Sequence, residues 1–193
     1  MTIIHTLRRG IVGALLGLAA LAAWGQSLTT QQITTLRAAV FADTTAAALL
    51  AGGNASGLQA YLNNPAVPTF VVWRTAVPID DIMRNGVDWA RVDNLSVGKA
   101  RIWDWMGRLG SLDCSKANIR AGIDATWVGT AADLAVRSTV YTHCKRAASA
   151  AERMLATGTG TDAVPGTMGF EGVVSELDAR RLVFKDDGTI WTP

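Results

Sequence analysis

The chain has 193 residues, 49% of them hydrophobic and 18% charged, and its 18 basic against 16 acidic residues give a net charge of +2. This composition excludes a strongly basic nucleic-acid binder and a disordered chain, because disorder accompanies low hydrophobicity and high net charge. With only two cysteines, the chain is also not a small disulfide-rich scaffold.

The first 26 residues form a hydrophobic leader. Arg8 and Arg9 precede an unbroken run of 13 apolar or small residues, Ile11–Ala23, as in a secretory signal. The run is shorter than the roughly 20 apolar residues of a membrane-spanning helix. Two interpretations stay open: a cleaved signal peptide, or a mis-called start codon ahead of a protein that begins near Ser27. Without the leader, 16 basic residues face 16 acidic ones, so the remaining chain is electroneutral.

Residues 29–63 predict three short amphipathic helices. Apolar residues recur there at helical spacing, and side chains suited to an N-cap stand before each helix, at Thr29, Asp43 and Asn54. The next segment, Thr69–Thr75, is rich in β-branched and aromatic residues between two prolines. That pattern predicts a strand that crosses the helices.

Five further helices are predicted between residues 78 and 156. The first would begin with Pro78 at its first position and run through Met83, and Asn85-Gly86 would close it. The other four begin behind a hydroxyl side chain, and two of them have the acidic residue three positions later that completes a capping box. These N-caps are Ser96, Ser115, Thr130 (with Asp133) and Ser149 (with Glu152). The helix behind Thr130 is expected to run through about Lys145.

The last part of the chain has a different character. Residues 157–170 hold four glycines and one proline, which predicts a flexible loop. Ser175 with Asp178 could cap a brief helix, and Asp187-Gly188 suits the turn of a small hairpin.

The predicted fold is mainly α: a compact bundle of short helices with one crossing strand and a small C-terminal β-hairpin. Three parts are expected along the chain: the leader at 1–26, a helical domain at 27–156, and a flexible loop with a hairpin arm at 157–193.

No residue pattern predicts a catalytic, metal or cofactor site. His143 and Cys144 are neighbours, and neighbouring side chains on a helix point about 100° apart, so the pair cannot form a catalytic dyad. One histidine outside the leader and two cysteines do not match zinc-site spacing. Gly158-x-Gly160 lacks the context of a phosphate loop. A hydrolase that uses Cys114 or Cys144 stays a minor hypothesis, and a disulfide between them is expected only if the leader directs export.

Two groups of residues are candidates for an interface. Trp103 and Trp105 differ by about 200° around a helix, so one of them should be exposed, partly buried or in contact with a partner. A helix face covered on two sides by the same chain is an equally good explanation. A local charge of +3 in residues 137–153 could meet an acidic protein rim or nucleic acid, although a solvated helix face is the commoner explanation. Its basic residues are Arg137, Lys145, Arg146 and Arg153.

Two runs carry a resemblance to a known family. Phe70–Met106, FVVWRTAVPIDDIMRNGVDWARVDNLSVGKARIWDWM, and Asn118–Leu134, NIRAGIDATWVGTAADL, resemble small virion proteins of tailed bacteriophages and prophages. The resemblance covers roughly Leu28–Gly172. It implies a non-enzymatic structural protein of the virion, a ring-forming adaptor, neck or completion protein at the head–tail junction. Members of the family begin near Leu28 without a leader, which favours the mis-called start, and the tail after Gly172 is less typical of them.

The resemblance also implies partners and a location. The expected partners are copies of the same chain in a ring, together with portal and tail or neck proteins, and the expected location is the virion, assembled in the host cytoplasm. Contact with DNA is not expected to be specific, and the folded domain is not expected to bind a membrane. A ring needs two unlike complementary patches on each subunit. The alternative is an exported bacterial helical domain with a cleaved signal and a Cys114–Cys144 disulfide, located in the periplasm or secreted.

Overall fold

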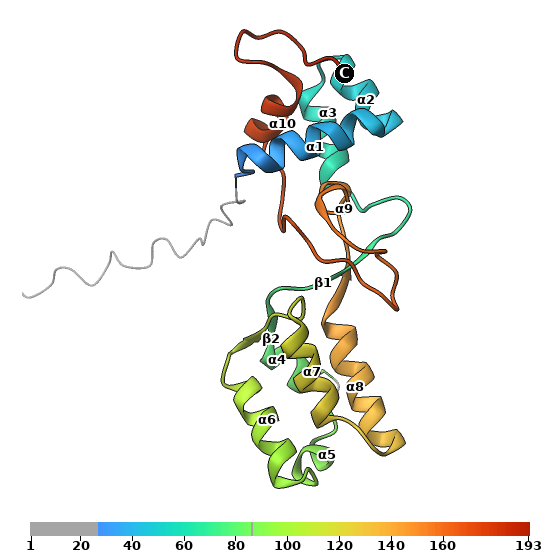
Figure 1. Ribbon diagram of the computed structural model, residues 1–193, viewed down its shortest axis with the longest axis vertical. Coiled ribbons are helices and arrows are strands. Elements are labelled where there is room, and N and C mark those ends of the chain that lie inside the picture. Colours follow the sequence, from blue (N-terminus) through green and yellow to red (C-terminus); the bar gives the residue numbers. More distant parts are fainter. Residues whose placement is uncertain (1–26, 86) are drawn as a thin grey trace, which may run out of the picture.

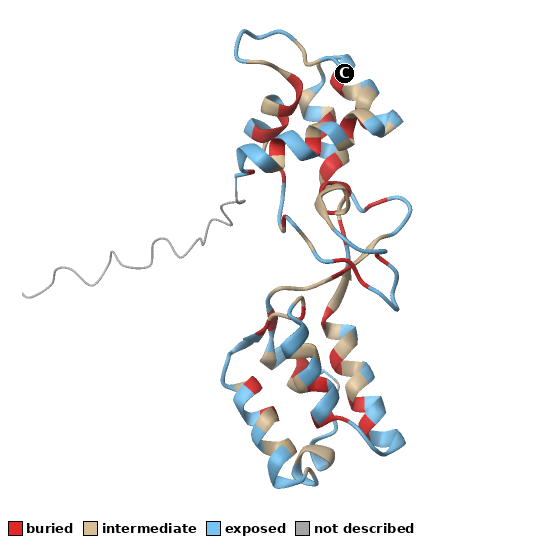
Figure 2. Cartoon of the chain, in the orientation of Figure 1, coloured by how far each residue is buried: buried red, intermediate tan, exposed pale blue. Residues whose placement is uncertain are grey.

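The computed structural model describes residues 27–85 and 87–193. Within these ranges the chain is mainly helical, with ten helices and two short antiparallel strand pairs (Figure 1). The predicted mainly α class is therefore confirmed. The helices form two lobes, and Figure 2 shows buried residues gathered inside each of them, so the arrangement is more extended than the expected single compact bundle. The leader and Gly86 of the predicted helix end lie outside the described residues.

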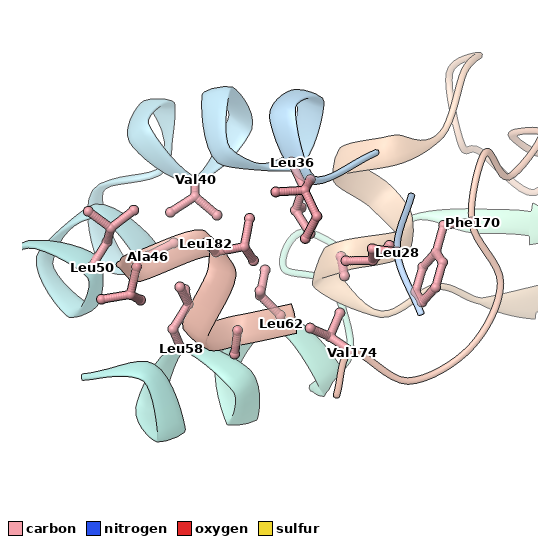
Figure 3. Close-up of a cluster of buried hydrophobic side chains, with 14 residues drawn as sticks. Leu28, Leu36, Val40, Ala46, Leu50, Leu58, Leu62, Phe170, Val174 and Leu182 are labelled. Atoms are coloured by element: carbon pink, nitrogen blue, oxygen red, sulfur yellow. The ribbon is translucent and has the colours of Figure 1, made fainter. Parts of the chain in front are cut away.

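The upper lobe in Figure 1 is built from both ends of the described chain. Its helices are α1 (Thr30–Ala42), α2 (Thr44–Ala51), α3 (Ala55–Asn63), α9 (Ala150–Leu155) and α10 (Glu176–Val183). Leu36 from α1, Leu58 from α3 and Leu182 from α10 meet in its core, fully buried (Figure 3). Burying one such side chain stabilises the folded state by roughly 1.5–3 kcal/mol. The upper core therefore depends on helices that are far apart in the sequence.

The lower lobe contains the middle of the chain. Its helices are α4 (Ile79–Arg84), α5 (Trp89–Asp93), α6 (Val97–Gly107), α7 (Ala117–Thr126) and α8 (Ala131–His143). A second core forms around Trp103, Ile123 and Trp127, and the rings of the two tryptophans meet edge to face at 5.2 Å. Strands β2 (Val77–Pro78) and β3 (Ser111–Leu112) pair antiparallel beside this core.

Two antiparallel strands connect the lobes. Strand β1 (Val71–Trp73) leads down from the upper lobe and β4 (Lys145–Ala147) leads back, so that Trp73 lies opposite Lys145 (Figure 1). The strand predicted at Thr69–Thr75 is thus confirmed. The helix expected to reach Lys145 ends at His143, because the next residues pair with β1 instead of continuing α8. The lower lobe is consequently an insertion between two halves of the upper lobe.

Most predicted helix starts are confirmed by side-chain caps. The capping residues found are Thr29, Asp43, Asn54, Thr130, Ser149 and Ser175. Ser96 is at the N-cap position of α6 without a side-chain cap bond, and α7 begins behind Lys116 rather than Ser115. Pro78 is the N-cap of α4 rather than its first residue. Helix α5, which begins behind Asp88, was not predicted from the sequence.

Helices α1 and α2 meet at a sharp bend of 106°. Asp43 forms the bend, because its backbone N–H bonds to the end of α1 while its carboxylate accepts from the first N–H groups of α2. No single helix in residues 27–85 and 87–193 is long and apolar enough to cross a membrane, although this bent pair together meets the length and composition.

Residues 157–172 differ from the expected flexible loop because they are hydrogen-bonded into the fold. Thr157 and Thr167 exchange backbone hydrogen bonds, and the Gly166 N–H donates to the Val71 carbonyl. A Cβ atom at Gly160 or Gly166 would collide with the ring of Phe70. The glycines that suggested flexibility therefore allow close packing of the loop against β1 and its neighbours.

The C-terminal arm also differs from the expectation. Helix α10 belongs to the upper core, with Leu182 and Val183 fully buried. The prediction of an arm missed the apolar face of this helix, which packs against the other helices of the upper lobe. Of the expected hairpin, the structure contains one isolated antiparallel bridge, between Phe184 and Ile190. The division into a helical domain at 27–156 and an arm at 157–193 that fold as separate units stays a prediction.

Candidate functional site

A cleft of about 660 Å³ lies on the lower lobe, beside the strands that lead to the upper lobe. Helices α7 and α8, strand β1 and the loop at Asp162 line it. The capping box of Thr130 and Asp133 sets the start of α8, so that one face of this helix forms a wall of the cleft. The volume falls within the range of about 300–1,000 Å³ typical of ligand sites.

Aromatic rings form the apolar part of the cleft. The ring centroids of Trp73 and Tyr141 are 5.7 Å apart, and the two rings are tilted by 53°. The guanidinium of Arg120 lies 4.9 Å from the Trp73 centroid, and the ammonium of Lys145 lies 6.0 Å from it. The cleft thus combines an aromatic surface with cations at its edge, an arrangement that suits a flat or anionic group.

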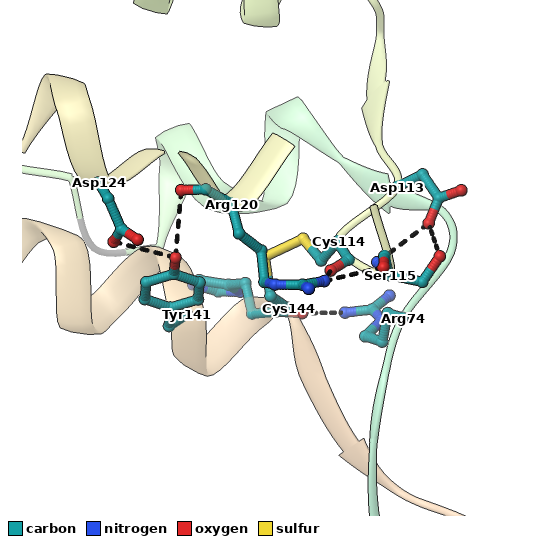
Figure 4. Close-up of a disulfide and its surroundings, with 9 residues drawn as sticks. Arg74, Asp113, Cys114, Ser115, Arg120, Asp124, Tyr141 and Cys144 are labelled. Carbon is teal, nitrogen blue, oxygen red and sulfur yellow. Dashed lines mark hydrogen bonds between the residues drawn. A yellow bond between two sulfur atoms is a disulfide. The ribbon is translucent and has the colours of Figure 1, made fainter. Parts of the chain in front are cut away.

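Three cations and two carboxylates line the cleft. Arg137 lies 3.7 Å from Asp124, and Lys145 lies 3.3 Å from Asp162. Arg120 instead donates to the backbone carbonyls of residues 114 and 115, and no ion pair of the described residues includes it (Figure 4). The cleft therefore has one positive charge in excess.

Tyr141 keeps its proton at the centre of this wall. Its hydroxyl donates to Asp124 at 3.0 Å, with the Arg120 carbonyl at 3.3 Å (Figure 4). Burial and this hydrogen bond raise the pKa of Tyr141 to about 12, because both disfavour the phenolate next to a carboxylate. At neutral pH the residue is therefore a neutral hydrogen-bond donor to Asp124.

A disulfide between Cys114 and Cys144 lies beside Arg120, which lines the cleft and donates to the Cys114 carbonyl (Figure 4). Both cysteines are fully buried, and the bond joins the segment before α7 to the end of α8. Arg74 adds to this connection, since its backbone N–H donates to the Cys144 carbonyl and its carbonyl accepts from the Cys114 N–H. Its guanidinium donates to the His143 carbonyl. The two cysteines are thus joined to each other, and the disulfide fixes the two helices that form the cleft.

The four basic residues predicted as one cluster are dispersed and paired. Arg137 and Lys145 line the cleft with the partners described above. Arg146 binds Glu152 at 2.7 Å and Glu171 at 3.2 Å, and Arg153 lies 3.5 Å from Asp43 in the upper lobe. A single basic helix face does not form, because these residues belong to α8, β4 and α9 rather than to one helix.

The two tryptophans of α6 face opposite ways, as the spacing predicts. Trp103 is 6% exposed and packs in the lower core, whereas Trp105 is 60% exposed. Sequence reasoning missed Trp89, which is 62% exposed on α5 between Asp88 and Asp93. An aspartate suited to an N-cap, directly before an aromatic residue, was the signal that could have indicated this helix. The helix is hard to predict because its five residues are too few to show an apolar periodicity.

No group of three or more His, Cys, Asp or Glu side chains suited to a metal ion occurs in the part of the chain that the structure describes. No protein-family model matches the sequence, and comparisons with curated proteins and with solved structures give no match.

Proposed function

We propose that the chain is a non-enzymatic structural protein of a tailed-phage virion, an adaptor or completion protein that joins neighbouring subunits at the head–tail junction. The support from the sequence is the resemblance of Phe70–Met106 and Asn118–Leu134 to such proteins. Its partners would be copies of the same chain together with portal and tail or neck proteins.

The observation that carries the proposal is the division into two lobes with separate cores, joined by β1 and β4. An adaptor contacts unlike partners at the same time, so it needs separate surfaces that do not compete for one core. The cleft suits such a contact, because it combines the rings of Trp73 and Tyr141 with ion-paired side chains at its edge.

Disruption of the gene in the phage or prophage tests this function. We expect cells that lack the protein to accumulate separate heads and tails, and a plasmid copy to restore joined particles, as counted by electron microscopy. Labelling of purified particles with an antibody should locate the protein at the junction. Normal yields of joined particles without the protein would contradict the proposal.

The Cys114–Cys144 disulfide favours a second candidate, an exported bacterial helical domain with a cleaved signal. Disulfides persist mainly in oxidising compartments, and a cytosolic virion protein would more often keep its thiols reduced. The mass of the protein from its native host separates the two candidates. A chain that begins near Gln26 and lacks two hydrogens supports export, whereas initiation near Ser27 without cleavage supports the virion protein.

A further inference from the structure

Trp89 is an exposed aromatic side chain with a carboxylate on either side of it in the sequence. It opens α5, where Asp88 is the N-cap and Asp93 is the last residue. No ion pair of the described residues includes either carboxylate, and Arg91 of the same helix binds Asp133 instead. This acidic tryptophan corner, Asp88, Trp89 and Asp93, thus presents an apolar ring and two exposed carboxylates to solvent, and the Asp88 carboxylate also accepts the capping hydrogen bond from the Ala90 N–H.

The fold itself does not use the ring of Trp89. The side chain is 62% exposed, and the lower core is formed without it. Large aromatic side chains exposed in this way are typical anchors of protein interfaces, because an indole buries much area with little loss of conformational freedom. The corner therefore has the character of a docking element that lacks its partner.

The cleft on the lower lobe has the complementary chemistry. Its aromatic surface, Trp73 and Tyr141, suits the indole, and its excess cation suits the carboxylates. Trp105 is a poorer match. Arg101 and Arg108 are exposed on the same helix face, and one carboxylate, Asp104, pairs with Arg108. The cationic cleft would repel that surface, so charge complementarity selects Trp89.

A chain does not fill its own cleft with this corner. Helix α5 lies at the end of the lower lobe that is far from the upper lobe, whereas Trp73 and Lys145 lie where β1 and β4 leave it (Figure 1). The acidic tryptophan corner that fits this cleft must therefore come from another copy of the chain. Contact between unlike patches of identical chains is heterologous and builds a ring or an open filament.

We propose that the acidic tryptophan corner of one copy docks in the Trp73–Tyr141 cleft of a second copy, and that this contact drives self-assembly. The inference deepens the proposed function, since it rests on the chain working as an oligomer and identifies the contact between its subunits. Trp89 is the anchor, Asp88 and Asp93 face the cations of the cleft, and each subunit uses one corner and one cleft.

Two variants remove the two halves of the contact. Trp89→Ala removes the anchor, and Thr142→Glu places a negative charge in the cleft at an exposed position of α8. Trp105→Ala removes an equally exposed tryptophan, and Ala135→Glu adds the same charge to an exposed position of α8 that does not line the cleft. Because all four positions are exposed, circular dichroism and thermal unfolding should show intact folds.

Sedimentation velocity of the full chain over a range of concentrations measures the contact. We expect the wild type and both controls to form species larger than a dimer. Trp89→Ala and Thr142→Glu should each weaken association by at least about 30-fold, the effect of losing a hot-spot residue. An equimolar mixture of these two variants should form dimers and nothing larger, because one intact corner meets one intact cleft.

Three results would overturn the inference: a wild type that stays monomeric, a Trp89→Ala variant that assembles like the wild type, or a mixture that contains only monomers. Particle labelling keeps the two proposals apart. If assembly needs Trp89 but particles lack the protein, the docking stands and the virion function fails. If particles contain the protein and Trp89→Ala still assembles, the docking fails and the virion function stands.

Discussion

Glu152 is a buried carboxylate whose donors come from three separate parts of the chain. Its side chain is 4% exposed and accepts two hydrogen bonds of 2.7 Å from Arg146, one of 2.9 Å from the Ser149 N–H and one of 3.2 Å from the Gly172 N–H. Burial alone would raise the pKa of Glu152, but these donors outweigh it and hold the pKa below its usual range. One residue thereby joins β4, the start of α9 and the segment before α10.

Replacing this carboxylate should show its contribution to stability. We expect Glu152→Gln to lower the free energy of unfolding by about 2 kcal/mol at neutral pH, because an amide keeps the capping geometry but loses the charge-assisted bonds. Since the folded-state pKa is lowered, this stabilisation is complete above the unfolded-state pKa of about 4.3 and is lost as the pH falls through the folded value.

Urea unfolding at a series of pH values measures this difference. The gap between the wild type and Glu152→Gln should close as the solution becomes acidic. Asp104→Asn is the control, because the Asp104–Arg108 pair is exposed and should change the free energy of unfolding by less than about 0.5 kcal/mol. A gap that stays constant down to strongly acidic pH would argue against the role assigned to Glu152.

At the scale of elements, the disulfide holds α7 and α8 together by closing a loop between cysteines 30 positions apart. In the chain-entropy model, a cross-link over a loop of this length restricts the unfolded chain and thereby stabilises the folded state by about 3–4 kcal/mol. The upper lobe contains no part of this loop. The bond should therefore stabilise the lower lobe selectively.

We predict that reduction, or the double variant Cys114→Ala and Cys144→Ala, increases hydrogen exchange in α7 and α8 and lowers the thermal midpoint of the lower lobe. Exchange in α1, α2 and α3 should stay unchanged and provides the internal control. Equal exchange in oxidised and reduced protein would show that the cross-link does not stabilise these helices.

The starts of the helices could be predicted from local signals in the sequence. The elements against which each helix packs could not be predicted in this way. The capping side chains of Thr29, Thr130 and Ser149 each bond to a backbone N–H three residues further on, so these caps can be predicted from neighbouring residues. The pairing of β4 with β1 and the packing of α10 on α3 join segments far apart in the chain, which local patterns do not encode. The candidate site shows the same division: the opposite facing of the α6 tryptophans was predictable, and the cleft was not.

At the scale of the whole molecule, the two cores share no buried residue. Such cores can unfold as separate cooperative units, each with its own stability. The connections through which the lobes influence each other include the strands β1 and β4, the bonds of Glu152 and the ion pair between Lys145 and Asp162.

Core substitutions test this independence. Leu58→Ala in the upper core and Ile123→Ala in the lower core should each cost about 2–5 kcal/mol, because both side chains are fully buried. Native-state hydrogen exchange should show increased exchange only in the lobe that carries the substitution, and each variant is the control for the other. Increased exchange in both lobes with either variant would mean that the chain unfolds as one unit.

The placement of the lower lobe as an insertion affects how the protein forms during translation. All elements of the lower lobe, from β2 to α8, are synthesised before α10, while α1, α2 and α3 still lack that helix. The lower lobe can therefore fold while the chain is still on the ribosome, and the leucines of the upper lobe stay uncovered until α10 emerges. A nascent chain that stalls before residue 176 would expose this apolar surface, which makes the interval before α10 is synthesised the period when the protein most needs a chaperone.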